Sequence, residues 1–199
     1  MSIVVAAFDV DGTVTSRDCV VPFLRRVAGT APMSARLALS IHRVAPALAR
    51  RDRDALKALA TRAVFTGRRI TDVEDAAVAF AEQIARDWLR EDTLARIRWH
   101  GAEGHRVVFV SASYGAYLRP LAHRLAVNDV VATELEVDAD GRCTGELVGG
   151  NCRGPEKARR LKAWLDAHHG GRDAVELWAY GDSPGDRELL ASADRPVWV

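Results

Sequence analysis

The chain lacks several features that mark secreted and membrane-spanning proteins. Only three of its 199 residues are cysteines, and their odd count and wide spacing argue against a disulfide framework. We expect reduced thiols in a cytoplasmic protein. Cys143 and Cys152 are the one pair for which a disulfide or a shared metal stays an alternative. No uncharged run approaches the roughly 18 to 20 residues of a membrane span. No charged leader with a cleavage site precedes the first apolar run, which begins at Ile3.

The chain as a whole has almost no net charge, but individual segments have one. The chain has 28 basic and 27 acidic residues, a net charge of +1, so bulk charge gives no reason to expect a nucleic-acid partner. The segment 17–71, however, holds twelve basic residues against three acids. Residues 72–104 reverse the balance, with eight acids against four basic residues. Such asymmetry predicts either a segment with its own surface task or a well-solvated helical face.

Apolar runs at residues 3–8, 107–110 and 177–180 predict buried strands of a parallel sheet. Residues 196–199 predict a last strand. Helical patterns at 114–126 and 155–168 lie between the second and third runs, and the proline that opens the latter suits the first turn of a helix. Strands that alternate with helices indicate an α/β fold with a parallel sheet.

Two segments interrupt this alternation. Residues 16–93 contain almost no strand pattern, and their apolar residues recur at helical spacing, as at Ala77, Phe80, Ile84 and Trp88. We therefore expect a helical bundle inserted after the first strand of a Rossmann-like sheet, with residues 1–15 and 94–199 forming the core. In residues 133–149, apolar and acidic side chains alternate around an Asp-Ala-Asp-Gly turn, which predicts a β-hairpin.

Side chains of catalytic types follow each of the three predicted strands. Asp9 and Asp11 follow the first, Ser111 follows the second, and Asp182 with Asp186 follows the third. Because the carboxyl ends of parallel strands form the crevice where ligands bind, we expect these side chains to lie close together. Clustered carboxylates repel one another, and a hard divalent cation such as Mg²⁺ relieves that repulsion.

Lys157, near the start of a predicted helix, adds a second positive group beside the same crevice. Carboxylates, a cation site, a hydroxyl and a lysine are the groups that phosphoryl transfer requires. The sequence therefore predicts a Mg²⁺-dependent phosphomonoesterase. A non-hydrolytic phospho-acceptor signalling domain shares these groups, but it lacks a helical insertion of this length and an Asp-x-Asp-Gly-Thr run.

The same residues resemble the four ordered motifs of the haloacid dehalogenase (HAD) superfamily. The motifs are the run Asp9-Val10-Asp11-Gly12-Thr13, the strand that leads to Ser111, Lys157, and the run 181–186. Their order, the insertion after the first motif, and Gly-Pro-Glu-Lys before a helix are similar to the phosphoserine-phosphatase-like branch. The resemblance covers nearly the whole chain and implies that residues 16–93 form a helical cap over the active site.

The resemblance also implies a role for each acid. Asp9 would be the nucleophile and would form an aspartyl-phosphate intermediate. Asp11 would protonate the leaving oxygen and then activate the hydrolytic water. Mg²⁺ would be held by the Asp9 side chain, the Asp11 backbone carbonyl and Asp182, with Asp186 as a ligand or as support for one.

Three further residues would bind the phosphoryl group in this resemblance: Ser111 and Lys157 through their side chains, and Gly12 through close approach of its backbone. Ser113 has two interpretations, a second phosphate contact or a helix N-cap, and the N-cap is favoured.

The sequence says less about the substrate. Asp18 follows Asp9 by nine residues, where phosphoserine phosphatases carry an acid that grips the substrate amine. The phenylalanine and arginine pattern that holds a serine carboxylate is not found, so phosphoserine is retained only as an alternative. The basic cap favours a bulkier anionic substrate, either a phosphorylated small molecule or a phospholipid headgroup. An apolar helical face at 33–48 leaves weak contact with an anionic membrane surface as an alternative to packing inside the cap. No pattern indicates an oligomeric state.

Overall fold

The computed structural model describes residues 3–29, 41–50 and 52–199, the first four residues of the middle range without their side chains. Within these residues one six-stranded sheet has the order β4-β3-β2-β1-β5-β6. Neighbouring strands are parallel except for β4, which runs antiparallel to β3. The strands are β1 (Ile3–Phe8), β2 (Arg106–Tyr114), β3 (Asp129–Val137), β4 (Cys143–Val148), β5 (Val175–Gly181) and β6 (Arg195–Trp198).

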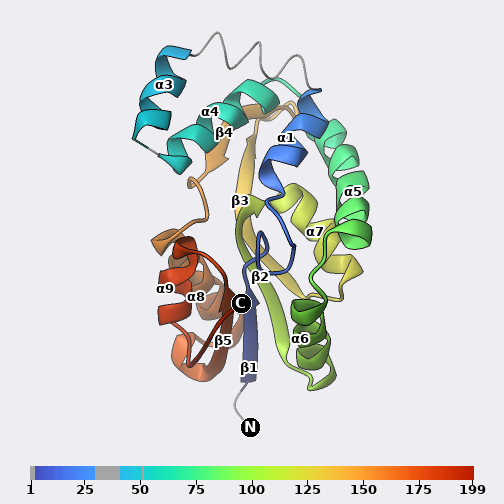
Figure 1. The fold of residues 1–199 in the computed structure, drawn as a ribbon, viewed down its shortest axis with the longest axis vertical. Coiled ribbons are helices and arrows are strands. Elements are labelled where there is room, and N and C mark those ends of the chain that lie inside the picture. Colours follow the sequence, from blue (N-terminus) through green and yellow to red (C-terminus); the bar gives the residue numbers. More distant parts are fainter. Residues whose placement is uncertain (1–2, 30–40, 51) are drawn as a thin grey trace.

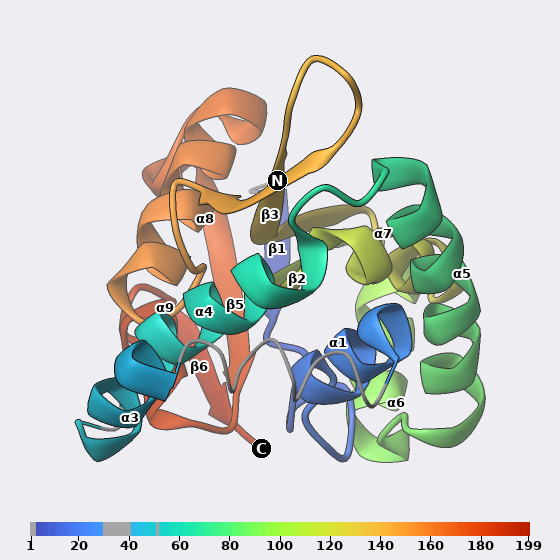
Figure 2. The ribbon, with the colours of Figure 1, turned by 90° about the horizontal axis from the view of Figure 1, so that it is seen from above.

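Helices cover both faces of this sheet, and Figure 2 shows the three layers from above. One face carries α8 and α9, and the other carries α5, α6 and α7. The helices are α1 (Val20–Ala28), α3 (Ile41–Ala49), α4 (Arg53–Phe65), α5 (Ile70–Asp87), α6 (Glu91–Ala102), α7 (Gly115–Arg124), α8 (Pro155–His169) and α9 (Arg187–Ala191), with short 3₁₀ turns η1 (Arg172–Ala174) and η2 (Pro184–Asp186).

The central strand β1 is buried on both faces, and its alternate side chains enter two different cores. Val5 and Ala7 pack in the core beneath α8 and α9, whereas Ala6 and Phe8 pack in the larger core on the opposite face. A strand covered on both sides needs apolar residues at consecutive positions. That requirement explains why the sequence shows a continuous apolar run here rather than alternation.

Helices between β1 and β2 contribute side chains to the core that also packs against the sheet. α1, α3 and α4 lie beyond the carboxyl ends of the strands, while α5 runs down beside α7 (Figure 1). Phe23 of α1 contacts the rings of Phe65, Phe80 and Tyr117, and these belong to the same core as Phe8. The insertion therefore shares its hydrophobic core with the sheet layer, which fixes α1 and α4 above the strand ends.

β2 is longer than the apolar run at 107–110 predicts. It continues through Ser-Ala-Ser to Tyr114, with a register shift against β3 between Val110 and Tyr114. The N-cap of α7 is Tyr114, without a side-chain hydrogen bond, so the favoured interpretation of Ser113 as an N-cap is wrong. Ser-Ala-Ser carries no apolar signal, and only pairing with the neighbouring strand shows that it is extended.

The predicted hairpin is confirmed by the antiparallel pairing of β3 with β4. β3 begins earlier than predicted, at Asp129, and its first half pairs in parallel with β2. Of the apolar face at 33–48, residues 33–40 lie outside the described residues, and so do Arg36 and Arg51 of the basic segment. Among the helices that are described, none is long and apolar enough to cross a membrane. All three cysteines are buried and free.

Candidate active site

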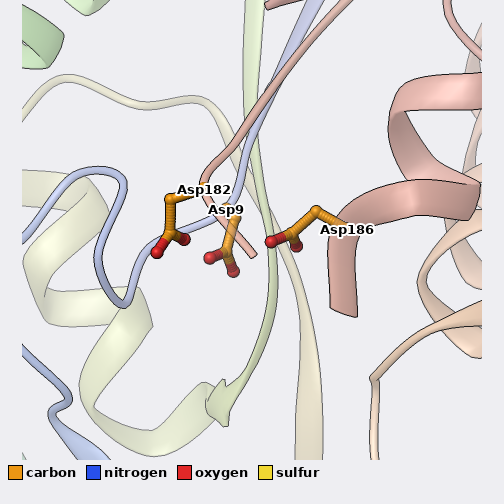
Figure 3. Close-up of side chains that lie close together, drawn as sticks. All are labelled: Asp9, Asp182 and Asp186. Carbon is orange, nitrogen blue, oxygen red and sulfur yellow. The ribbon is translucent and has the colours of Figure 1, made fainter. Parts of the chain in front are cut away.

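Three carboxylates converge beyond the ends of β1 and β5, as Figure 3 shows for Asp9, Asp182 and Asp186. β1 and β5 are parallel neighbours in register, so the chain leaves both strands at the same edge of the sheet. One carboxylate oxygen of each residue lies within 4.8 Å of the others. Asp9 and Asp186 are buried, whereas Asp182 is exposed. The structure thus brings together three of the four acids to which the sequence assigned a metal.

Two glycines make this close approach of carboxylates feasible. Gly12 has φ +85°. A Cβ added to it would lie 2.7 Å from Asp182 Cγ and would collide with that carboxylate. A Cβ on Gly181 would come within 2.6 Å of the Asp186 Cβ. Neither position has room for a side chain, and the first also needs a backbone conformation that glycine adopts without strain.

The donor atoms at this edge fit a hard divalent cation. The group contains only carboxylates, with no histidine or cysteine among the described residues that compose it. Asp182 accepts a hydrogen bond from Thr13 Oγ1 at 3.1 Å and retains lone pairs for a second partner. Such an oxygen set suits Mg²⁺ or Ca²⁺ better than Zn²⁺. The Asp11 carboxylate is not part of this group.

Lys157 lies between two of the acids. Its Nζ donates to Asp9 Oδ1 at 2.5 Å and also to Asp186 Oδ1. Burial works against the lysine charge, but Asp9 and Asp186 together raise its pKa above the usual value. Burial raises the pKa of Asp9 to about 6, against the lowering effect of Lys157. At neutral pH the Asp9 carboxylate is therefore ionised and carries the charge that a nucleophile needs.

Asp11 faces a different set of partners from Asp9. Its Oδ2 accepts a hydrogen bond from Ser113 Oγ at 2.6 Å, and its Oδ1 accepts one from the Cys19 backbone N–H at 3.2 Å. Tyr117 in turn donates to Ser113 Oγ at 2.5 Å. Burial is the main cause that raises the pKa of Asp11 to about 7. A carboxyl group with this pKa can both donate and accept a proton near neutral pH.

The remaining predicted residues line one cavity of about 610 Å³ at the carboxyl edge of the sheet. Ser111 is buried in its floor, where its Oγ accepts a hydrogen bond from the Ser113 N–H at 3.1 Å. Gly12 and Lys157 line the same cavity as Asp9. Asp18 also lines the cavity, and its Oδ1 accepts a hydrogen bond from the Val21 N–H in the first turn of α1.

Sequence reasoning missed several residues that line or support this cavity. Lys57 and Arg53 of α4 line it, and so does Arg153 in the loop before α8. Arg90 donates to the Gly12 carbonyl at 3.0 Å and so holds the loop after β1. One signal was available, since Arg53 and Lys57 are four residues apart and share a helix face. The direction in which that face points is set only by packing.

Comparison with known proteins identifies the family. The model for haloacid dehalogenase-like hydrolases matches residues 6–191, which is most of the chain. The chain belongs to the HAD family of hydrolases. It is 38% identical over 192 residues to Protein CicA of Caulobacter vibrioides, a match that covers 94% of this chain and 82% of that protein. The expected identification as a hydrolase of the HAD type is thus confirmed.

Two solved structures of HAD-like fold also match. A protein of unknown function from Bordetella pertussis Tohama I superposes with a TM-score of 0.81 at 22% identity, over 100% of this chain and 90% of that one. A substrate-bound phosphoserine phosphatase has a TM-score of 0.62 at 16% identity, over 97% and 84% of the two chains. The likeness to the phosphoserine-phosphatase-like branch holds for the fold, and the HAD family with such neighbours supports a phosphoric monoester hydrolase.

Proposed function

We propose that this HAD hydrolase is a Mg²⁺-dependent phosphomonoesterase that works through an aspartyl-phosphate on Asp9. The observation that carries the proposal is that Asp9 belongs to a group of three carboxylates at the edge of the sheet and also accepts a hydrogen bond from Lys157. Asp9, Asp182 and Asp186 would hold the metal, together with the Asp11 backbone carbonyl. When bound, Mg²⁺ neutralises charge on the phosphoryl oxygens and helps to orient them.

In the first step an oxygen of Asp9 attacks phosphorus in line with the ester bond. The bond between phosphorus and the alcohol oxygen breaks, and Asp11 gives its proton to that oxygen. Lys157 and Ser111 bind equatorial phosphoryl oxygens and so stabilise the negative charge of the transition state. In the second step Asp11 takes a proton from water, whose oxygen attacks phosphorus. The bond between phosphorus and the Asp9 oxygen breaks, inorganic phosphate leaves, and the Asp9 carboxylate is restored.

We also propose that residues 16–93 act as a cap that selects the ester and that the protein works in the cytoplasm. The support for the cap is that α1 and α4 contribute to the wall of the cavity opposite the strand ends. The size of the cavity favours a substrate larger than phosphate itself, whether a small or a lipid-linked ester. Phosphoserine is the second candidate, because Asp18 lines the cavity.

Steady-state release of phosphate from p-nitrophenyl phosphate tests the reaction. We expect turnover that requires Mg²⁺, that falls at least 1000-fold in Asp9→Asn, and that persists in Asp140→Asn, which changes an acid of the exposed hairpin turn. Acid-quenched enzyme should carry one phosphoryl group on the peptide that contains Asp9. Stoichiometric phosphorylation without turnover would favour a phospho-acceptor signalling domain, and no reaction with any divalent metal would overturn the proposal.

The membrane alternative has its own test. Flotation with vesicles that contain anionic lipids should leave the protein unbound at low salt if the helical face at 33–48 packs inside the cap. Binding that is lost as salt increases would support contact between the basic cap and an anionic surface.

A further inference from the structure

Lys57 is a buried amine whose pKa is lowered to about 7 by burial, against the raising effect of Asp11. Its side chain enters from α4, and only 9% of the residue is exposed. The Nζ donates to three neutral oxygens: the Ala112 carbonyl, Thr133 Oγ1 at 3.1 Å and Asn151 Oδ1 at 2.8 Å. No ion pair joins it to any acid in the described part of the chain. A buried charge is costly unless a charge of opposite sign accompanies it.

Two arginines line the same cavity, also without an ion pair among the described residues. Arg53 lies one turn before Lys57 on α4. The acids on either side of Arg53 have other partners, since Asp52 caps the helix at the Ala55 N–H and Asp54 accepts a hydrogen bond from Asn151 Nδ2 at 2.6 Å. Both guanidinium groups are therefore available to a ligand.

Arg153 lines the cavity from the loop between β4 and α8. A Cβ added to Gly185 would lie 3.4 Å from Arg153 Nε, so the two residues are neighbours. That position sets Arg153 beside η2, which carries Asp186. The cavity thus has three cations that the proposed phosphomonoesterase reaction does not use, in addition to Lys157.

Apolar side chains form the rest of the wall near α1 and α4: Val20, Val21, Leu24, Leu56 and Ala60. A ligand that reaches from Asp9 towards these helices would place carbon against this wall. Three cations match a dianion such as phosphate better than a single carboxylate, for which one cation suffices. The cavity therefore combines a phosphoryl-transfer end, an apolar section and a second anion-binding group.

We propose that Arg53 and Arg153 bind a second phosphate of the substrate, as a monoester or a diester, on the alcohol that leaves from Asp9, and that Lys57 adds positive charge beside it. The substrate class is then a phosphomonoester whose alcohol carries another phosphate beyond a short aliphatic segment. This inference rests on the proposed phosphomonoesterase function and specifies its substrate.

Three esters of one carbon chain test the subsite: 1,3-propanediol bisphosphate, 3-phosphooxypropanoate and n-propyl phosphate. With Mg²⁺ present, we expect kcat/KM for the bisphosphate to exceed both others by about tenfold or more, after correction for its two equivalent phosphates. Equal values for the three esters would overturn the proposal. A preference for the carboxylate would overturn it as well and favour a phosphoserine-like substrate.

Substitutions show whether the named residues cause the preference. Lys57→Met and, separately, Arg153→Met should reduce the bisphosphate preference to about threefold or less. Arg62→Met is the matched control, because Arg62 also lies on α4 but pairs with Glu146 outside the cavity. This variant should retain the full preference. If Lys57→Met does not fold, Arg153→Met decides alone, and an unchanged preference in it contradicts the assignment.

Binding separates this inference from the proposed reaction. Calorimetry on Asp9→Asn with Mg²⁺ should give a dissociation constant at least tenfold lower for the bisphosphate than for propyl phosphate. That ratio tests the subsite even if the wild-type protein hydrolyses none of the three esters. A ratio near one in an enzyme that does hydrolyse p-nitrophenyl phosphate rejects the subsite and leaves the phosphomonoesterase proposal standing.

The source of the second phosphate is resolved by one more comparison. The same propanediol bisphosphate is prepared with a dialkylglycerol esterified to its second phosphate and is presented in phosphatidylcholine vesicles. Faster hydrolysis of this compound than of the free bisphosphate supports a lipid headgroup as the source, and slower hydrolysis supports a soluble metabolite. Failure of both compounds to exceed propyl phosphate overturns the subsite.

Discussion

Ser113 Oγ lies 2.6 Å from Asp11 Oδ2 and donates a hydrogen bond to it. The Tyr117 hydroxyl, in the first turn of α7, donates a hydrogen bond to Ser113 Oγ at 2.5 Å. Two hydroxyl groups thus connect the loop after β1 to the end of β2 and to α7. Because the Cys19 N–H holds the other Asp11 oxygen, the carboxyl group is fixed in one orientation.

Ser113→Ala should impair the protonation of poor leaving groups more than that of good ones. An alkyl phosphate needs the Asp11 proton when the ester bond breaks, whereas p-nitrophenolate leaves without one. We expect kcat/KM to fall about 10- to 100-fold for propyl phosphate and less than threefold for p-nitrophenyl phosphate. Ser113→Thr should restore much of the lost activity. Equal losses on both esters would show that Ser113 has only a structural role.

Tyr117→Phe and Tyr114→Phe form a matched pair of variants. Both tyrosines are buried in the same aromatic cluster, and each hydroxyl is hydrogen bonded to another hydroxyl, Tyr117 to Ser113 and Tyr114 to Thr61 at 2.7 Å. Only the first bond leads to Asp11. We expect Tyr117→Phe to lower kcat/KM for propyl phosphate about three- to tenfold, and Tyr114→Phe to change it by less than twofold. Similar effects of the two variants would contradict a specific link to Asp11.

Gly12→Ala tests the close approach of the first loop to the metal-binding acids. The new methyl group would displace the Asp182 carboxylate, so we expect Mg²⁺ affinity measured by calorimetry to fall at least tenfold. The control is Gly141→Ala, which has a similar positive φ of +73° but open space around the new Cβ. Both variants should lose about 1–2 kcal/mol of unfolding free energy through backbone strain. Only Gly12→Ala should lose the metal.

His100 should make the folded state sensitive to acid. It is buried against Tyr180 and shares a hydrogen bond with its hydroxyl at 2.9 Å and another with His105 at 2.8 Å. Burial, with a smaller effect of the nearby His105, lowers the pKa of His100 from 6.5 to about 4. The unfolded chain therefore binds a proton at this residue at a higher pH than the folded chain does. This residue's contribution to stability is complete above about pH 6.5 and is lost as the pH falls towards 4.

Urea unfolding at pH 7, 5.5 and 4 measures this effect. Between pH 7 and 4, the free energy of unfolding should fall by about 3 kcal/mol less in His100→Gln than in the wild type. His123→Gln changes an exposed histidine on α7 and should leave the pH profile as in the wild type. If the His100→Gln and wild-type profiles run parallel, the histidine is not the group responsible.

The sequence by itself determined the α/β class, the hairpin and the family, because each depends on local pattern. A doubly covered strand such as β1 requires a continuous apolar run, and the residues that follow such runs must meet at one edge of a parallel sheet. Asp9, Ser111 and Asp182 were found in this way. Lys157 followed from its place at the start of a helix and from the motif order.

Only the tertiary structure decided the contacts that depend on packing between distant segments. Ser113 looked like a helix cap, because nothing local shows that β2 continues past Ser111 and aims this hydroxyl at Asp11. Lys57 looked like one more cation in a basic segment. Its burial arises because α4 shares a hydrophobic core with α1 and the sheet layer, which turns one face of the helix towards the cavity. Helical spacing places residues on a common face, but only packing selects what that face meets.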